Sequence, residues 1–142
     1  MGNYQELMFY QKARQVTKRV DVLIKSWPKT MQAQEISRQL FRSAISIGAN
    51  IAEGHGRHQG TEYIHYLIIA QGSANETEHW LHTAQDCNLS TDKKIDEIVE
   101  LNNEVVRMIT TTINTIRANQ GPRSVREEKT GYLTASSLIN ND

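Results

Sequence analysis

One stretch constrains the fold of this chain more than any other: residues 35–57, EISRQLFRSAISIGANIAEGHGR. Its apolar residues recur every three or four positions, as on one face of an α-helix, at Ile36, Leu40, Ala44, Ile47 and Ile51. Beside that face runs a second row of apolar or small residues, namely Phe41, Ile45, Gly48 and Ala52. A surface helix needs an apolar stripe of only about 100°. The stretch therefore predicts a helix over about residues 34–54 that is covered on two sides, by its own bundle and by something else.

Three further segments show helical periodicity. A helix over residues 4–27 has the seam Phe9, Ala13, Val16, Val20, Leu23 and Trp27, and Pro28 ends it. The glycine-rich residues 54–60 predict a turn, after which a third helix begins near Thr61 with the inner seam Tyr63, Leu67, Ala70, Ala74, Thr77, Leu81 and Ala84. A break at residues 88–90 precedes a fourth helix, which is capped by Ser90 or Thr91 and ends near Asn119. The sequence predicts an all-α, up-down-up-down four-helix bundle over residues 1–119, followed by a flexible polar tail over residues 120–142.

Composition places the chain among ordinary globular proteins. Its 142 residues, 38% hydrophobic and 23% charged, suit one domain with a real core. The single cysteine excludes an internal disulfide framework and suits a reducing compartment. No run approaches the roughly 20 apolar residues of a membrane span, and we expect a cytoplasmic protein with no membrane contact.

The net charge of zero conceals an uneven distribution along the chain. Residues 1–60 hold nine Lys or Arg against four Asp or Glu, whereas residues 61–105 hold two against nine. In the first helix, Arg14, Lys18 and Lys25 lie opposite the apolar seam, with Lys12 and Arg19 on one flank. These five residues are the candidate nucleic-acid-binding set, although a solvated helix face often carries as many cations. Interleaved aromatic residues are missing, so sequence-specific readout is not expected.

A polar row lies on the other side of the second helix and has two interpretations. The row includes Arg42, Asn50, Glu53 and Arg57, and Ser73 and Glu76 are their candidate partners on the third helix. In the structural interpretation, these groups form buried hydrogen bonds and ion pairs that set the register of the two helices. In the functional one, they line a ligand or nucleic-acid surface. The structural interpretation is favoured, because a row containing carboxylates repels phosphate.

No catalytic or metal site is predicted, and no cofactor. Two Glu-x-x-His pairs, Glu62–His65 and Glu76–His79, resemble those of di-iron bundles. Both lie on the third helix, about 21 Å apart at 1.5 Å per residue, so they cannot share a metal in one subunit. His55 and His58 are expected to be solvated turn residues, and Cys87 is expected to be a small buried residue.

Two blocks of sequence carry a family resemblance. They are Gln39-Leu40-x-Arg42-Ser43-Ala44-x-Ser46-Ile47-x-x-Asn50-Ile51-Ala52-Glu53-Gly54-x-Gly56-Arg57 and Tyr63-x-x-Tyr66-Leu67-x-x-Ala70-x-Gly72-Ser73-x-x-Glu76. Both resemble blocks of the four-helix-bundle family of proteins encoded in 23S rRNA intervening sequences. That family is similar in turn to the accessory variability proteins of diversity-generating retroelements. The resemblance implies a ring-shaped homopentamer that binds RNA or DNA and assists a reverse transcriptase.

From the residues and the resemblance together, we expect a non-enzymatic nucleic-acid-binding accessory protein that assembles with copies of itself. The alternative is a structural or protein-interaction ring without nucleic-acid contact.

Overall fold

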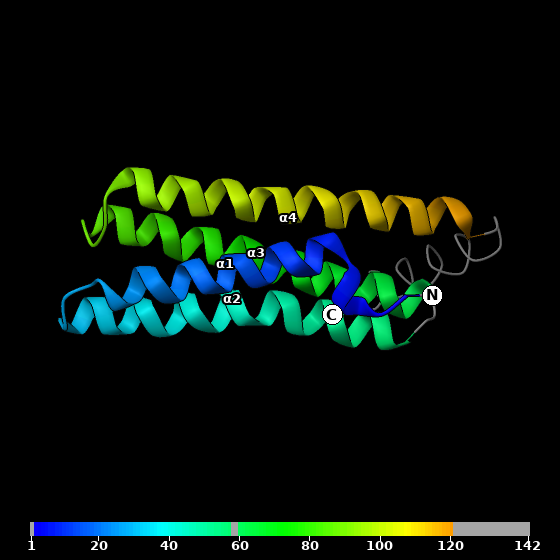
Figure 1. The fold of residues 1–142 in the computed structure, drawn as a ribbon, viewed down its shortest axis with the longest axis horizontal. Coiled ribbons are helices and arrows are strands. Elements are labelled where there is room, and N and C mark those ends of the chain that lie inside the picture. The colour runs from blue at the N-terminus through cyan, green and yellow to red at the C-terminus, as the bar shows by residue number, and fades with distance from the viewer. Residues whose placement is uncertain (1, 58–59, 121–142) are drawn as a thin grey trace, which may run out of the picture.

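The computed structural model describes residues 2–57 and 60–120 of the chain. These residues form a short 3-10 helix, η1 (Tyr4–Glu6), and four α-helices: α1 (Met8–Lys25), α2 (Met31–Arg57), α3 (Gly60–Asp86) and α4 (Asp92–Asn119). Successive α-helices run in opposite directions along one long axis (Figure 1). The up-down-up-down bundle predicted from the periodicity is therefore present. The expected tail lies almost wholly outside the described residues.

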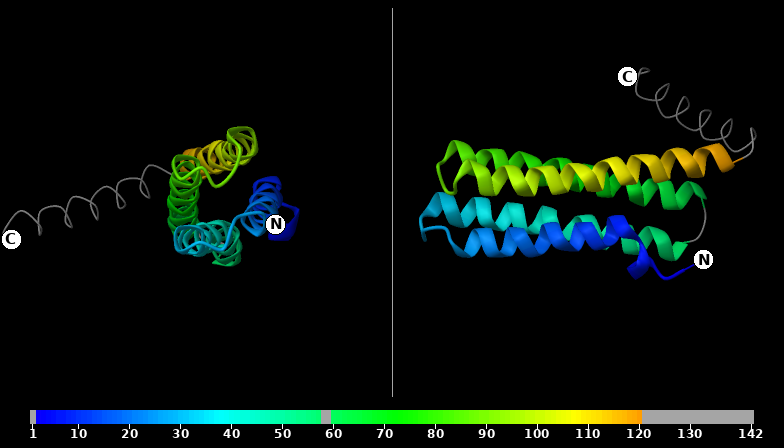
Figure 2. Two further views of the ribbon diagram at one scale, coloured as in Figure 1. Left: turned by 90° about the vertical axis from the view of Figure 1, so that its left-hand side faces the viewer. Right: turned by 45° about the horizontal axis from the view of Figure 1, so that its top comes forward.

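The core consists of the predicted seams. Every predicted inward position of α1 is buried, as are Ile36, Leu40, Ala44, Ile47 and Ile51 of α2. On α3 one position differs, because Ile64 is buried while Tyr63 is only half-buried. Burial also raises the pKa of the Tyr63 hydroxyl. Viewed end-on, the helices follow one another around the bundle in chain order (Figure 2), so α4 closes it against α1.

The first predicted helix is divided in two. Asn3 caps η1 through its side chain, which accepts a hydrogen bond from the Gln5 amide at 3.4 Å. Leu7 is extended, so α1 begins only at Met8, and it ends at Lys25, two residues before the predicted end. Trp27 beyond it stays buried, and its indole N–H donates to Ser90 Oγ at 2.6 Å.

The second helix is longer at both ends than predicted. It begins at Met31, because the Thr30 hydroxyl accepts a hydrogen bond from the Ala33 amide at 3.2 Å and caps the first turn. It also continues through Gly54 and Gly56 to Arg57, although a turn was predicted there. No described glycine has a positive φ. Gly54 instead allows close packing, since a Cβ added there would lie 2.6 Å from Cβ of Tyr66.

The connection between α3 and α4 follows the prediction. Asn88 has a φ of 55°, in the left-handed region that Asn tolerates better than most residues. The Leu89 amide bonds back to the Ala84 carbonyl at 3.0 Å and closes the end of α3. Thr91 is the N-cap residue of α4 by position, without a side-chain hydrogen bond.

Not every apolar residue enters the core. Phe41 and Ile45 of α2 are 36% and 46% exposed, and Ile69 of α3 is 38% exposed. The bundle therefore leaves part of the second apolar row of α2 uncovered, as the width of its apolar arc predicted. None of the four described helices combines the length and hydropathy needed to cross a membrane.

Candidate nucleic-acid interface

The outer face of α1 carries the basic row. The seam of α1 faces the core, so Arg14, Lys18 and Lys25 on the opposite side are exposed to solvent. Arg19 is also exposed, whereas Lys12 is half-buried at the contact with α4. The five predicted residues thus lie on one helix, but they do not form a single surface.

Two of the five cations are already paired. Lys12 Nζ lies 2.7 Å from Glu104 Oε2 across the α1–α4 contact, and this ammonium lowers the pKa of the Glu104 carboxyl. Lys25 Nζ lies 2.8 Å from Asp21 Oδ2, one helical turn earlier on α1. Within the described residues, Arg14, Lys18 and Arg19 have no such ion pair. The cations available to an anion are therefore these three.

Two grooves flank the outer face of α1, and Lys18 lines both. The α1–α2 groove is a cavity of about 260 Å³, with walls formed by Tyr10, Arg14, Thr17, Lys18, Ile45, Gly48, Ala49 and Ala52. The α1–α4 groove has about 340 Å³ and is lined by Lys18, Arg19, Val22, Leu23, Ser26, Lys94, Glu97 and Ile98. Each groove has an apolar floor and a basic rim, so it suits a partner with both apolar and negatively charged parts.

The polar row of α2 makes a smaller contact with α3 than predicted. Ser46 Oγ and Ser73 Oγ are hydrogen-bonded at 2.9 Å, and Asn50 Nδ2 donates to the Ser46 carbonyl at 2.8 Å. Deeper in the same interface, Thr77 Oγ1 donates to Ser43 Oγ at 2.9 Å, and both residues are buried. Short hydroxyl side chains thus link α2 to α3.

The charged members of that row point outward, and the prediction of a buried ionic network is wrong for them. Arg42, Glu53 and Glu76 are exposed. Glu53 pairs with Arg57 on its own helix at 2.7 Å, and Glu76 accepts from Trp80 on α3 at 3.3 Å. Charged side chains this long reach solvent more cheaply than they desolvate against a neighbouring helix.

Arg57 is the exception, because it reaches across to α3. Its guanidinium lies 5.6 Å from the ring centre of Tyr66, and Nη2 lies 3.4 Å from the Tyr66 hydroxyl. The hydrogen bond to Glu53 and the nearby Tyr66 raise the pKa of Arg57. This contact lies at the end of the α2–α3 interface, where Tyr66 also packs against Gly54.

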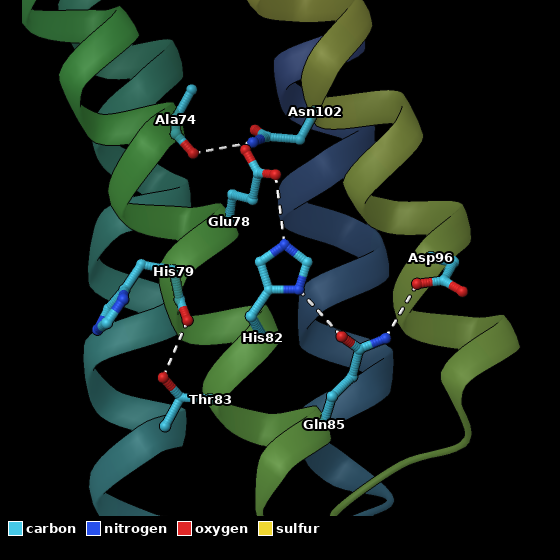
Figure 3. Close-up of polar contacts among 8 residues, drawn as sticks. All are labelled: Ala74, Glu78, His79, His82, Thr83, Gln85, Asp96 and Asn102. Atoms are coloured by element: carbon cyan, nitrogen blue, oxygen red, sulfur yellow. Dashed lines mark hydrogen bonds and ion pairs between the residues drawn. The ribbon is translucent and has the colours of Figure 1, made fainter.

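A polar chain on α3 and α4 was not predicted from the sequence (Figure 3). His82 Nε2 lies 3.3 Å from Glu78 Oε1, and Nδ1 lies 3.0 Å from Gln85 Oε1. Gln85 Nε2 in turn donates to Asp96 Oδ1 on α4 at 2.9 Å. The hydrogen bond to Gln85 and the interactions with Glu78 raise the pKa of His82. Glu78 and His82 are four residues apart, which is the only sequence signal for this chain.

Asn102 of α4 is also visible in Figure 3 and was also missed. It is fully buried, and its Nδ2 donates to the Ala74 carbonyl at 2.8 Å. Its position on the inner face of α4, between Ile98 and Val105, was the available signal.

Other predicted features differ from what the structure shows. His55 is buried, not solvated, with Nε2 at 2.8 Å from the Gly2 carbonyl and its ring against Tyr63. Cys87 was expected to be buried and is exposed. His58 lies outside the described residues. Within the described ranges, no group of three or more His, Cys, Asp or Glu side chains is placed to hold a metal ion.

Comparison with known proteins agrees with the fold. The structure defines an all-helical, four-helix-bundle protein with a basic outer helix. A family model described as "23S rRNA-intervening sequence protein" matches residues 5–111, and the chain belongs to that family.

One solved structure shows the same architecture. It is a protein of unknown function from the S23 ribosomal protein family of Bacteroides thetaiotaomicron. It is 28% identical, with a TM-score of 0.67, over 75% of this chain and 98% of that one. No curated protein matches the chain.

Proposed function

We propose that this protein is a non-enzymatic nucleic-acid-binding accessory protein. The observation that carries the proposal is a row of exposed cations on the outer face of α1, Arg14, Lys18 and Arg19, which have no ion pair within residues 2–57 and 60–120. Such side chains bind phosphates by charge, without reading sequence. From the resemblance to retroelement accessory proteins, we further propose that the protein assists a reverse transcriptase, holding RNA or DNA while another face contacts the polymerase.

Self-association is the second part of the proposal. Three contacts per chain give weak binding, but a ring repeats them on every subunit, and linked weak sites raise the overall affinity steeply. The exposed Phe41, Ile45 and Ile69 support assembly, because burying such side chains stabilises a subunit interface. The resemblance implies five subunits.

The second candidate function is a scaffold that binds proteins and not nucleic acid. The formal net charge of zero favours it, since most nucleic-acid-binding domains are basic overall. The ion pairs of Lys12 and Lys25 also favour the scaffold, because they leave only three of the five predicted cations available to phosphate.

The test titrates fluorescent single-stranded RNA and DNA with the full-length protein at two salt concentrations, and light scattering determines the mass of the same sample. Three available cations per subunit predict a slope of log K against log salt of about −2 for each subunit engaged. The variant Arg14→Gln/Lys18→Gln/Arg19→Gln is expected to lose most of the binding. The matched control, Lys12→Gln/Lys25→Gln, also removes cations from α1 but only ones already paired, and is expected to retain most of it.

The outcomes separate the two candidates. An oligomer that binds neither nucleic acid at low salt would exclude direct contact and leave the scaffold. Equal losses of nucleic-acid affinity in the two variants would show that Arg14, Lys18 and Arg19 contribute no more to binding than the paired Lys12 and Lys25. A monomer that binds nucleic acid would refute the proposed self-association but not the proposed nucleic-acid binding.

A further inference from the structure

The α1–α4 groove has features that nucleic-acid binding does not explain. Its floor is apolar: Leu23 and Ile98 form the buried bottom, and Val22 stands beside them with 70% of its surface exposed. Covering Val22 with an apolar group would remove its surface from water, which is favourable. A phosphate backbone does not supply that cover.

The rim of the groove is predominantly basic. Lys18 and Arg19 lie on the α1 side and Lys94 on the α4 side, whereas Glu97 is the one carboxylate among the lining residues. In the part of the chain that the structure describes, none of these four side chains is in an ion pair. The groove thus offers three cations against one anion around an apolar floor, which fits an occupant that is apolar on one side and acidic along its edges.

The shape of the groove is suited to a helix. It lies between two antiparallel helices, and on α1 its lining extends from Lys18 to Ser26. Eight residues of helix span about 12 Å, or slightly more than two turns. The Lys12–Glu104 ion pair crosses from α1 to α4 on the side of Lys18 nearer the start of α1, and neither residue lines the groove. A groove of this length accepts three apolar side chains spaced at i, i+3 or i+4, and i+7.

We propose that the α1–α4 groove is a docking site for an acidic amphipathic helix of a partner protein. The apolar side chains of that helix cover Val22, Leu23 and Ile98, and its carboxylates meet Lys18, Arg19 and Lys94. The proposal stands apart from nucleic-acid binding, although the two surfaces share Lys18 and Arg19. A partner in the α1–α4 groove leaves Arg14 accessible, whereas Lys18, which lines both grooves, contacts the partner.

The experiment uses two fluorescein-labelled helical peptides of about 15 residues, a length at which isolated helices begin to be stable. Both carry leucine at the spacing above; one has glutamate at most remaining positions and the other has lysine there. Fluorescence anisotropy measures their binding to the full-length protein at ~0.15 M salt, where exposed charges more than about 8 Å apart are largely screened. Circular dichroism checks that each protein variant is folded.

We expect the acidic peptide to bind at least about tenfold more tightly than the basic one. Val22→Ser, which removes apolar surface without changing charge, is expected to weaken binding about fivefold to tenfold. Lys94→Gln is expected to weaken it by about threefold to tenfold, as for one rim charge. The matched control is Arg14→Gln, which removes an exposed α1 cation outside the groove, and it is expected to change the affinity less than about twofold.

Several results would overturn the proposal. One is equal affinity of the two peptides, or no binding of the acidic peptide at about 1 mM, the weak limit of specific association. Another is an Arg14→Gln effect as large as that of Lys94→Gln, which would mean general charge attraction. A third is a loss of single-stranded RNA binding in Val22→Ser and Lys94→Gln equal to the loss of peptide binding, which would assign the groove to nucleic acid. Unchanged RNA binding in those variants, with peptide binding lost, supports the docking site.

Discussion

Replacing Gly54 with alanine tests how α2 and α3 approach each other. Gly54 is buried near the end of α2, and an added Cβ would lie 2.6 Å from Tyr66 Cβ and 3.2 Å from Tyr63 Cδ2. Tyr66 Cβ is attached directly to the backbone, so it cannot turn away as the end of a flexible side chain does. The substitution therefore forces α2 and α3 apart.

The magnitude is a balance between two effects. Alanine favours a helix by about 1 kcal/mol relative to glycine. Overpacking of a buried contact costs about 1–3 kcal/mol, and the short distance to a fixed atom places this site in the upper half of that range. We expect Gly54→Ala to lower the free energy of unfolding by about 1–2 kcal/mol and the Tm by about 3–8 °C.

Gly72→Ala is the matched control. Gly72 lies within α3, and nothing stands within 4 Å of an added Cβ. Only the helix preference remains there, so this variant is expected to gain up to about 1 kcal/mol. Urea and thermal unfolding, at equal protein concentration because association shifts apparent stability, measure both variants. If Gly54→Ala proves as stable as Gly72→Ala, the close approach at Gly54 is refuted.

Three further predictions concern polar contacts. Thr77→Val removes the donor to Ser43 in the buried α2–α3 interface and is expected to cost about 1 kcal/mol in urea unfolding; an unchanged midpoint would contradict this. The raised pKa of His82 means that its contribution to stability is present below pH 6.5 and is lost as the pH rises through the folded-state pKa. In Tm measurements from pH 5 to 9, His82→Gln should remove the fall in stability that comes from deprotonation of His82. If the Tm curves of this variant and the unmodified chain run parallel over that range, His82 makes no such contribution. The lowered pKa of Glu104 beside Lys12 has the opposite sign, with stability present above pH 4.5 and lost as the pH falls through the folded-state pKa. Glu104→Gln should flatten the acid limb of the Tm profile, and an acid limb as steep as that of the unmodified chain would count against the pair.

Much of the fold could be predicted from the sequence because helical periodicity is local. The seam of α1 and the inner face of α2 are buried as predicted. The ends of α2 were harder to predict, because a glycine can serve a turn or a close helix contact. At Gly54 the neighbouring Tyr66, twelve residues later, decides between the two.

The candidate site was predictable in location but not in detail. The spacing of Arg14, Lys18 and Lys25 correctly places them on the outer face of α1. The sequence could not show that Lys12 forms an ion pair with Glu104, 92 residues later. Nor could it show that Lys18, Arg19 and Lys94 line the same groove.

The sequence by itself determined the four α-helices of the described residues, their inward faces and the excess of cations at the start of the chain, since each of these follows from residues within a few turns of one another. Only the tertiary structure decided which cations lack an ion pair among the described residues, which apolar residues stay exposed and where the grooves lie. Those properties depend on the register of α1 against α2 and α4. Packing between segments distant in sequence sets that register, and side-chain spacing within one helix does not.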